Sequence, residues 1–327
     1  LYRKYRPKDF SEVVGQDHLI SVIRREVETG RVAHAYLLSG PRGVGKTTVA
    51  RLIAKSVNCA KMGGGADDVP CNTCDSCNVF NAGQSLNLIE IDAASNRGID
   101  EIRELREAVR FAPAGGGQKV YIIDEVHQLT KEAFNALLKT LEEPPAHVVF
   151  VLATTELDKV PQTITSRTQH FDFRRPRETV IRERLLSVAK QEGVALEPEA
   201  AAVIAFVAEG SIRDAESALG KVLAVADGGV SANDVSEVLG IPRREALIEF
   251  LGLIGRRELA ATVELLNRLY HEGYEMEHLA KMLVGFFRDA LLSKTAAAGE
   301  GVRADSLLPE DRTTLAKHLE GYSASDL

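Results

Sequence analysis

The hydrophobic pattern of roughly the first 173 residues alternates between short apolar runs and helical periods. Four runs of mainly aliphatic residues are bounded by turn residues and predict strands at 35–38, 88–91, 120–123 and 148–152. Apolar positions between strands recur at helical spacing, as in Phe134, Leu137, Leu138 and Leu141. Near-continuous apolar strands separated by helices are typical of a buried parallel sheet. We therefore predict an α/β domain over residues 1–174.

From Pro176 onward the pattern favours helices, and we expect no strand there. The predicted helices are separated by glycines and cover 177–192, 197–209, 213–226 and 231–239. Gly240-Ile241-Pro242 indicates a second boundary, after which another set of helical periods begins. The predicted organisation is a sheet domain, a small helical domain and an all-α C-terminal domain, with boundaries at 1–174, 175–240 and 243–327.

A glycine-rich segment follows the first predicted strand and precedes a helix. Its residues are Gly40, Pro41, Arg42, Gly43, Val44, Gly45, Lys46, Thr47 and Thr48, and up to Thr47 they match the G-x-x-x-x-G-K-[ST] pattern. Glycines let backbone N–H groups turn toward phosphates, and the helix points its positive end at them. Lys46 would reach the β- and γ-phosphates, and Thr47 would ligate Mg²⁺. A coincidental glycine-rich turn is the alternative, but the flanking strand and helix favour a nucleoside triphosphate, ATP above all.

An acidic pair, Asp124-Glu125, follows the third predicted strand. The carboxyl end of a buried strand faces the ligand crevice of an open α/β sheet. Asp124 suits a partner of Mg²⁺, and Glu125 suits the group that polarises an attacking water. The alternative is an acidic pair placed at a helix N-terminus because the helix dipole favours it.

The chain has four cysteines, in a spacing typical of metal sites. Cys71, Cys74 and Cys77 form a C-x2-C-x2-C cluster, and eleven residues separate Cys59 from Cys71. Four soft ligands suit a tetrahedral zinc ion, and disulfides are unusual in the cytosol. An iron–sulfur cluster and free or oxidised thiols are the alternatives. No open ligand position is evident, so we predict a structural zinc module over 59–77.

Composition excludes some classes of protein. The longest apolar run, Ala200 to Ala208, is too short to span a membrane. The first residues are basic and no apolar stretch follows them, so we expect no signal peptide and a cytoplasmic location. The net charge of −7 argues against a polybasic nucleic-acid binder. The first 57 residues are nevertheless net basic, which fits either a surface that tracks a phosphate backbone or a merely solvated face.

The phosphate loop, the acidic pair and the helices after the sheet together resemble an AAA+ ATPase. More specific segments resemble the gamma/tau family of bacterial DNA polymerase III clamp-loader subunits. They are Tyr5-Arg6-Pro7 with Val13-Val14-Gly15-Gln16, the four-cysteine insertion, Ile91 to Asn96, Phe134 to Pro145, and Gly210 to Ala215. This resemblance covers most of residues 1–220. It implies an AAA+ domain with a zinc insertion, a helical lid domain and a helical collar domain that oligomerises.

The resemblance also implies roles for single residues around ATP. Thr155 would sense the γ-phosphate, Arg213 would be a second sensor from the lid, and Arg167 would be an arginine finger acting on a neighbouring subunit. The adenine would be surrounded by Tyr5, Arg6, Pro7, Val13 and Val14. Thr168 stands where the family usually has Cys, but the arginine before it is retained. Taken singly, Arg167 and Arg213 fit surface ion pairs equally well.

The function that the resemblance implies is that of the ATP-driven motor of a sliding-clamp loader. Its partners would be delta- and delta-prime-type subunits, other copies of the chain, the clamp and primer–template DNA. The residues expected to face DNA are Ser95, Asn96, Arg97 and Arg103. Two alternatives are another AAA+ machine, such as a branch-migration helicase, and an inert scaffold subunit of the same loader. The cysteine insertion argues against the first, and the intact Lys46 and Asp124-Glu125 argue against the second.

Overall fold

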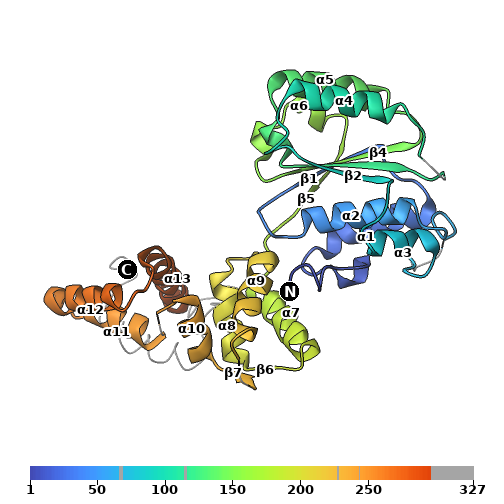
Figure 1. The fold of residues 1–327 in the computed structure, drawn as a ribbon. Helices are drawn as coiled ribbons and strands as arrows, with labels where there is room; N and C mark the ends of the chain where they lie inside the picture. The colour runs from blue at the N-terminus through green and yellow to red at the C-terminus, as the bar shows by residue number, and fades with distance from the viewer. Residues whose placement is uncertain (66–68, 114–115, 227, 243, 296–327) are drawn as a thin grey trace. The chain divides into compact units, whose positions relative to one another are not determined.

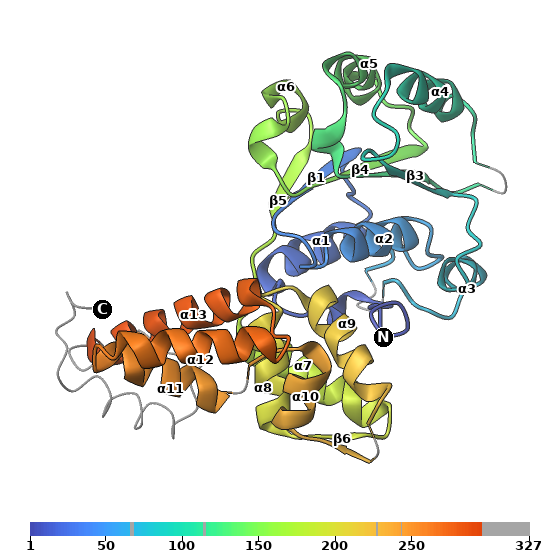
Figure 2. The same cartoon turned by 60° about the vertical axis from the view of Figure 1, so that its left-hand side comes forward.

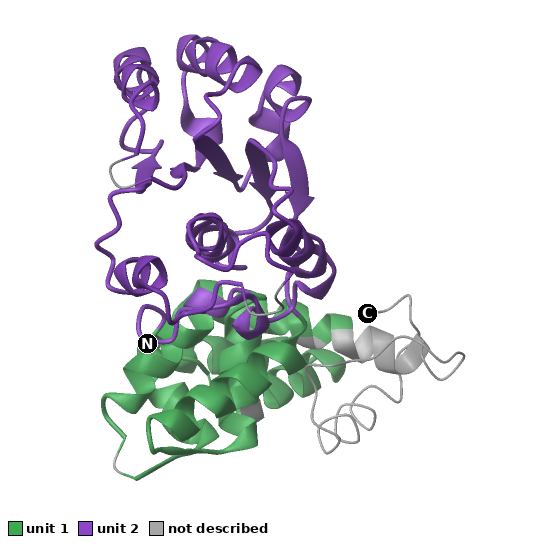
Figure 3. Cartoon of the chain, turned by 90° about the vertical axis from the view of Figure 1, so that its right-hand side faces the viewer, with its two compact units in different colours: residues 1, 177–210, 214–327 green, residues 2–176, 211–213 purple. Residues whose placement is uncertain are grey.

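The computed structural model describes residues 1–65, 69–113, 116–226, 228–242 and 244–295. The chain divides into two compact units, which Figure 3 shows in different colours. The sheet unit comprises Tyr2–Pro176 together with Ser211–Arg213. The helical unit comprises Leu1, Arg177–Gly210 and the chain from Asp214 onward.

The sheet unit is built on five parallel strands in the order β2-β3-β4-β1-β5. Their bounds are Ala35–Ser39 (β1), Leu88–Asp92 (β2), Lys119–Asp124 (β3), Val148–Thr154 (β4) and Gln169–Asp172 (β5). The four predicted strands are confirmed, whereas the pattern missed β5. This strand lies at the edge of the sheet, and only Phe171 of its four residues is buried. Such a strand has no apolar run by which to recognise it.

Helices cover both faces of the sheet (Figure 1, Figure 2). On one face lie α1 (Asp17–Thr29) and α2 (Lys46–Val57), and they pack on side chains such as Tyr36 and Leu38 of β1. On the other face lie α4 (Ile99–Val109), α5 (Lys131–Glu142) and the short α6 (Gln162–Thr165), which pack on Leu37. The two faces alternate along β1 because successive side chains of a strand point in opposite directions.

Shorter elements fill the connections of the sheet unit. They are the 3₁₀ turns η1 (Phe10–Glu12), η2 (Val126–Gln128) and η3 (Leu157–Lys159), and the helix α3 (Asp75–Asn81). The turn η2 follows β3 directly, and η3 lies shortly after β4. Because all five strands are parallel, these turns and the phosphate loop meet at the carboxyl edge of the sheet.

The helical unit confirms the predicted helices to within a few residues. They are α7 (Glu178–Gln191), α8 (Pro198–Val207), α9 (Ile212–Leu223, whose first two residues belong to the sheet unit), α10 (Ala232–Leu239), α11 (Arg244–Gly255), α12 (Leu259–His271) and α13 (Met276–Thr295). A core that includes Leu247, Leu251 and Leu265 joins the last three. The expectation that no strand follows Pro176 was wrong. Ala195–Leu196 (β6) pairs with Gly229–Val230 (β7), and runs of two residues carry no detectable period.

Candidate functional site

The phosphate loop has the glycine conformations that the sequence predicted. Gly40, Gly43 and Gly45 have φ of 133°, 76° and 106°, a region that other residues rarely adopt. A Cβ at Gly40 would overlap the backbone oxygen of Phe173, and one at Gly43 would overlap the Ser211 hydroxyl. The loop is therefore shaped by close packing on both sides. Helix α2 begins at Lys46, so its N-terminal N–H groups face the concave side of the loop.

Lys46 lies inside this loop. Its Nζ donates hydrogen bonds to the backbone oxygens of Gly40, at 2.6 Å, and Pro41, at 2.7 Å. Only 6% of the residue is exposed. Burial lowers the pKa of Lys46, while the nearby carboxylates of Glu125 and Asp124 oppose that shift. A buried cation that rests on two loop carbonyls is well placed to exchange them for phosphate oxygens.

The acidic pair stands opposite the loop, at the end of β3. The hydroxyl of Thr47 donates to Asp124 Oδ2 at 2.9 Å, and Asp124 Oδ1 accepts the backbone N–H of Glu125 at 3.0 Å. Thr47 and Asp124 are the two residues predicted to hold Mg²⁺, and the fold brings them into direct contact. A hydroxyl and a carboxylate on adjacent elements are hard oxygen ligands of the type that Mg²⁺ prefers.

Glu125 has an unusual backbone. Its φ is 50° and its ψ is 43°, the left-handed region, in which a residue with a side chain is strained. The carboxylate turns toward the end of β4, where the Thr155 hydroxyl donates to Oε2 at 2.9 Å. Thr155, the expected γ-phosphate sensor, thus holds Glu125, the residue expected to polarise water. Nothing in the sequence predicted this contact, because it joins two turns 30 residues apart.

Arg213 also reaches the phosphate loop within the sheet unit. Its backbone N–H donates to the Gly43 oxygen at 3.4 Å, and its guanidinium lies 5.0 Å from the centre of the Tyr2 ring. The expected adenine segment runs nearby. Val13 is buried, whereas Tyr5, Arg6, Pro7 and Val14 are half-buried. Burial lowers the pKa of Arg6, and the Arg51 charge lowers it further. A cation with partly exposed apolar neighbours suits a nucleotide base with an attached phosphate group.

Arg167 lies away from these groups, just after α6. Its guanidinium pairs with Glu142 at 2.7 Å and donates to the Thr163 oxygen at 2.8 Å. Glu142 is the last residue of α5, where the negative end of the helix dipole disfavours a second negative charge. The positive charge of Arg167 offsets both the Glu142 carboxylate and the negative end of the helix dipole. The side chain remains 35% exposed.

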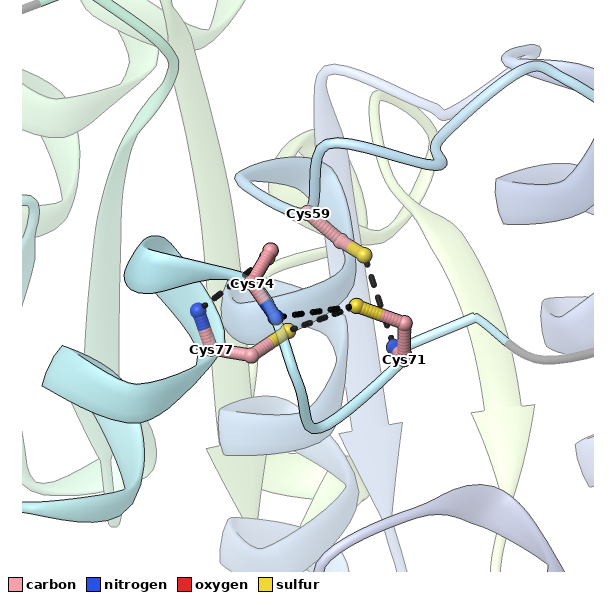
Figure 4. A group of neighbouring side chains, drawn as sticks. All are labelled: Cys59, Cys71, Cys74 and Cys77. Carbon is pink, nitrogen blue, oxygen red and sulfur yellow. Dashed lines mark hydrogen bonds between the residues drawn. The ribbon is translucent and has the colours of Figure 1, made fainter.

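The four cysteines converge as predicted (Figure 4). All four Sγ atoms lie within 4.8 Å of one another, and those of Cys71 and Cys77 are 4.0 Å apart. Zinc–sulfur bonds of about 2.3 Å in a tetrahedron place sulfurs roughly 3.8 Å apart, so the spacing fits a zinc ion. Backbone N–H groups of Cys71, Cys74 and Cys77 donate to the sulfurs of Cys59, Cys71 and Cys74 at 3.4, 3.4 and 3.5 Å. Such bonds stabilise thiolates, the form that binds metal.

Two of the thiols differ strongly in their surroundings. The Thr73 hydroxyl and its backbone N–H lower the pKa of Cys71 to about 5. Burial raises the pKa of Cys77, which is fully enclosed. A buried cation, Lys55, lies beside this cluster and donates to the Lys8 oxygen at 2.9 Å, to Asn81 Oδ1 at 2.6 Å and to Asn72 Oδ1. A metal ion would remove the need for any of the four thiols to stay protonated.

Comparisons with known proteins find matches for most of the chain. Residues 15–177 match a family model described as DNA polymerase III, delta subunit, and residues 180–228 match the ATPase lid domain of the DNA polymerase III clamp loader subunit. Residues 230–326 match domain III of the DNA polymerase III subunits gamma and tau. The chain is 42% identical over 302 residues to DNA polymerase III subunit tau of Bacillus subtilis, which covers 92% of this chain and 53% of that protein.

A shorter relative decides the family. DNA polymerase III subunit gamma of Buchnera aphidicola is 38% identical over 295 residues, which are 90% of this chain and 80% of that protein. The chain belongs to the DNA polymerase III gamma/tau family. It spans about half the length of the tau relatives, since the match to the Escherichia coli subunit, also 42% identical, covers 46% of that protein.

The solved structures agree on the fold. RuvB of Thermotoga maritima, a Holliday junction branch migration motor, superposes with a TM-score of 0.56 over 85% of this chain and 88% of that chain. At 21% sequence identity this likeness shows the fold alone. The chain therefore has the predicted arrangement of a parallel α/β sheet followed by helices. No helix among its described residues combines the length and apolar character needed to cross a bilayer.

Of the residues expected to face DNA, Ser95, Asn96 and Arg97 lie in the turn after β2, and Arg103 lies on α4. Asp92 organises this turn, because its carboxylate accepts from the Ser95 hydroxyl at 3.0 Å and its backbone oxygen from the Asn96 amide at 2.9 Å. Arg97 donates to the Ala94 oxygen at 2.8 Å, and Arg103 pairs with Asp100 at 3.0 Å on α4. Both arginines are exposed.

Sequence reasoning missed two buried polar groups. One is Lys55, which is 4% exposed on α2 and looks in the sequence like any surface lysine of a helix. The other is His127, a buried histidine two residues beyond Glu125. A histidine shortly after an acidic pair at a strand end is the one available signal, and it does not by itself distinguish a functional residue from a core residue.

Proposed function

We propose that this chain binds and hydrolyses ATP as the motor subunit of a bacterial sliding-clamp loader. The observation that carries the proposal is the contact between Thr47 and Asp124, at 2.9 Å, beside a formed phosphate loop with Lys46 inside it. In the proposed cycle, ATP binding orders an assembly that opens the clamp and grips primer–template DNA. Hydrolysis then releases both. Clamp, DNA and the delta- and delta-prime-type subunits are the partners.

The chemistry at the sheet edge follows from the residues present. Lys46 and the loop N–H groups bind the β- and γ-phosphates, and Thr47 and Asp124 hold Mg²⁺, which neutralises charge on the phosphate oxygens. Glu125 orients the attacking water, and Thr155, which donates to Glu125 at 2.9 Å, meets the γ-phosphate. Arg213 reaches the nucleotide from the start of α9. Tyr5, Arg6, Pro7, Val13 and Val14 surround the base.

Arg167 acts in trans in this proposal. Its ion pair with Glu142 and its bond to the Thr163 oxygen hold it on α5 and α6 of its own chain. From there it meets ATP on a neighbouring subunit, where a cation stabilises the charge that develops as the γ-phosphoryl group leaves. An assembly of several chains is therefore needed for full activity.

Zinc is the metal that best fits the four cysteines. The Sγ spacing, the backbone N–H bonds to sulfur and the lack of open positions support a structural ion held by Cys59, Cys71, Cys74 and Cys77. The ion would fix the segment between α2 and α3. No catalytic step depends on it.

The proposed domains are an AAA+ domain over 1–174, a lid over 175–240 and an oligomerising collar over 243–327. The family matches at 15–177, 180–228 and 230–326 support this division. The collar extends into residues 296–327, which lie outside the described residues. Ser95, Asn96, Arg97 and Arg103 face DNA in the assembly, and the protein works in the cytoplasm.

Clamp binding separates this proposal from its alternatives. The chain is assembled with its partner subunits, and binding to the clamp is measured with ATP, with ADP and without nucleotide. We expect ATP to strengthen clamp binding and ADP to release it. Branch migration without clamp binding would favour a RuvB-like machine, and clamp binding that ignores nucleotide would favour an inert scaffold subunit.

A further inference from the structure

The histidine beside the acidic pair has no role in the proposed chemistry, yet it is one of the most enclosed polar side chains near it. The side chain of His127 is 3% exposed. It lies on η2, the turn that follows Glu125. Burial of an imidazole is costly unless both ring nitrogens have partners. Here both ring nitrogens have partners.

Both nitrogens of the ring have close polar partners. Nε2 is 3.1 Å from the Glu156 carboxylate and 2.9 Å from the Gln128 side-chain amide nitrogen. Nδ1 is 3.0 Å from the Thr154 hydroxyl. That hydroxyl also accepts the Glu156 backbone N–H at 3.0 Å. His127 thus ties the turn after β3 to the end of β4.

The same ring nitrogen approaches the candidate catalytic carboxylate. Nδ1 is 3.5 Å from Glu125 Oε2, the oxygen that also accepts the Thr155 hydroxyl. Oε2 therefore has both the Thr155 hydroxyl and the His127 ring as neighbours. A ring displaced from this position would open space beside Oε2 and let the carboxylate rotate.

The backbone of Glu125 gives a second reason to expect a positioning role. Its left-handed conformation is strained and persists only where neighbouring contacts enforce it. Those contacts are the bond from the Gln128 N–H to the Glu125 oxygen at 2.8 Å and the burial of Val126 and His127. His127 is the member of this turn that is bonded to another strand through its side chain.

We propose that His127 is a positioning residue for ATP hydrolysis, whose buried ring, bonded through Nδ1 to Thr154, fixes the turn that presents the Glu125 carboxylate. This inference rests on the proposed ATPase function. It predicts that His127 affects the chemical step and leaves ATP binding intact, because Lys46 and the loop do not depend on η2.

Substitutions that keep one ring nitrogen at a time test the inference. The chain is assembled with its partner subunits, clamp and primed DNA, and kcat and KM for ATP are measured. His127→Ala should lower kcat roughly 10- to 100-fold, the cost of a misplaced catalytic group, with KM within about twofold of wild type. His127→Asn keeps a hydrogen-bonding group at the Nδ1 position and should recover most of the rate. His127→Gln keeps a group at the Nε2 position and should not.

Two controls make the result specific. His147 bonds to the Val109 oxygen at 3.1 Å at the opposite end of β4, so His147→Ala should leave kcat unchanged. Thr154→Val keeps the branched shape on the strand but removes the partner of Nδ1, and it should lower kcat several-fold. This variant decides the question if His127→Ala does not fold.

Three results would overturn the inference. They are a His127→Ala or Thr154→Val kcat equal to that of wild type, recovery by glutamine instead of asparagine, and a loss confined to KM. In each case the wild-type assembly still hydrolyses ATP and Glu125→Gln still abolishes hydrolysis. If instead the wild type shows no turnover, the proposed function fails and the inference fails with it.

Discussion

The two ends of helix α2 carry the two predicted ligand sites, and they are built differently. At its first residue, Lys46, the phosphate loop is shaped by neighbours that leave no room for a Cβ at Gly40 or Gly43. The four cysteines follow the last residue of the helix, Val57, and Lys55 in the last turn of the helix lies beside them. The first site is formed at the edge of the sheet, whereas the second combines burial of Cys59 and Cys77 in the core with polar contacts and four converging thiols.

The two sites also differ in what completes them. The cysteine site has all its ligands within one chain, because the four sulfurs already lie within 4.8 Å of one another. The phosphate loop has its lysine, its acidic pair and Thr155, but Arg167 is held elsewhere by Glu142. We therefore expect the metal to bind a single chain and hydrolysis to require an assembly.

The largest expected effect concerns Arg167, which lies away from the phosphate loop of its own chain. Arg167→Ala should lower ATP hydrolysis by the assembly by roughly 10³–10⁵-fold, the range for arginine fingers, with little change in ATP affinity. Steady-state turnover and equilibrium ATP binding measure the two quantities. A parallel loss of affinity would contradict the assignment.

A mixing experiment tests whether Arg167 acts in trans. Subunits with Arg167→Ala and an intact loop are combined with Lys46→Ala subunits that retain Arg167. Each interface that joins an intact loop to an intact arginine should recover hydrolysis. If the subunits assemble together and recover none, Arg167 is only the ion-pair partner of Glu142.

The next largest effect concerns the loop itself. Lys46→Ala removes a charged hydrogen-bond donor worth about 1.5–3 kcal/mol, so ATP affinity should fall roughly 10- to 100-fold while the fold is kept. Titration calorimetry gives the affinity, and circular dichroism checks the fold. Lys190→Ala, which changes an exposed lysine on α7, is the matched control and should bind ATP as wild type does. Equal affinity in both variants would refute the role of Lys46.

Metal removal should affect the sites at the two ends of α2 differently. Protein purified without chelator should contain about one zinc per chain, and the Cys71→Ser variant should contain much less. After chelation, amide exchange should rise in residues 59–81 while ATP affinity stays within about twofold, because the sheet keeps the loop in shape. A zinc content near zero in the untreated protein would exclude the zinc site.

The smallest expected effect concerns Lys55, near the C-terminal end of α2. Lys55 lies in α2, where burial lowers its pKa, and donates to acceptors in the N-terminal segment and beside the cysteines. Lys55→Met keeps the apolar stem but leaves these acceptors unpaired, so the free energy of unfolding should fall by about 1–3 kcal/mol. Urea denaturation measures this loss. An unchanged midpoint would show that water replaces the lysine at no cost.

The sequence predicted the parts of the site that depend on local pattern. The phosphate loop, the acidic pair and the cysteine cluster each occupy a short segment whose residue types and spacing follow from the chemistry. Four strands were found because they are continuous apolar runs. The edge strand β5 was missed because only Phe171 of its residues is buried.

The contacts that tune the site could not be predicted in the same way. Thr155 meets Glu125 across 30 positions, and Lys55 bonds to Lys8, which lies 47 positions away. Each contact depends on the register of strands and on the turn that follows them. A buried histidine such as His127 looks in the sequence like any other histidine, and only its enclosure reveals it.

ATP turnover by the assembled complex tests the central claim most directly. The chain is combined with its partner subunits, and hydrolysis is measured with and without clamp and primed DNA, for wild type and for Lys46→Ala. We predict turnover that clamp and DNA stimulate in the wild-type complex and that disappears in the variant. A wild-type complex that assembles on the clamp but hydrolyses no more ATP than the Lys46→Ala complex would contradict the claim that this chain is the motor.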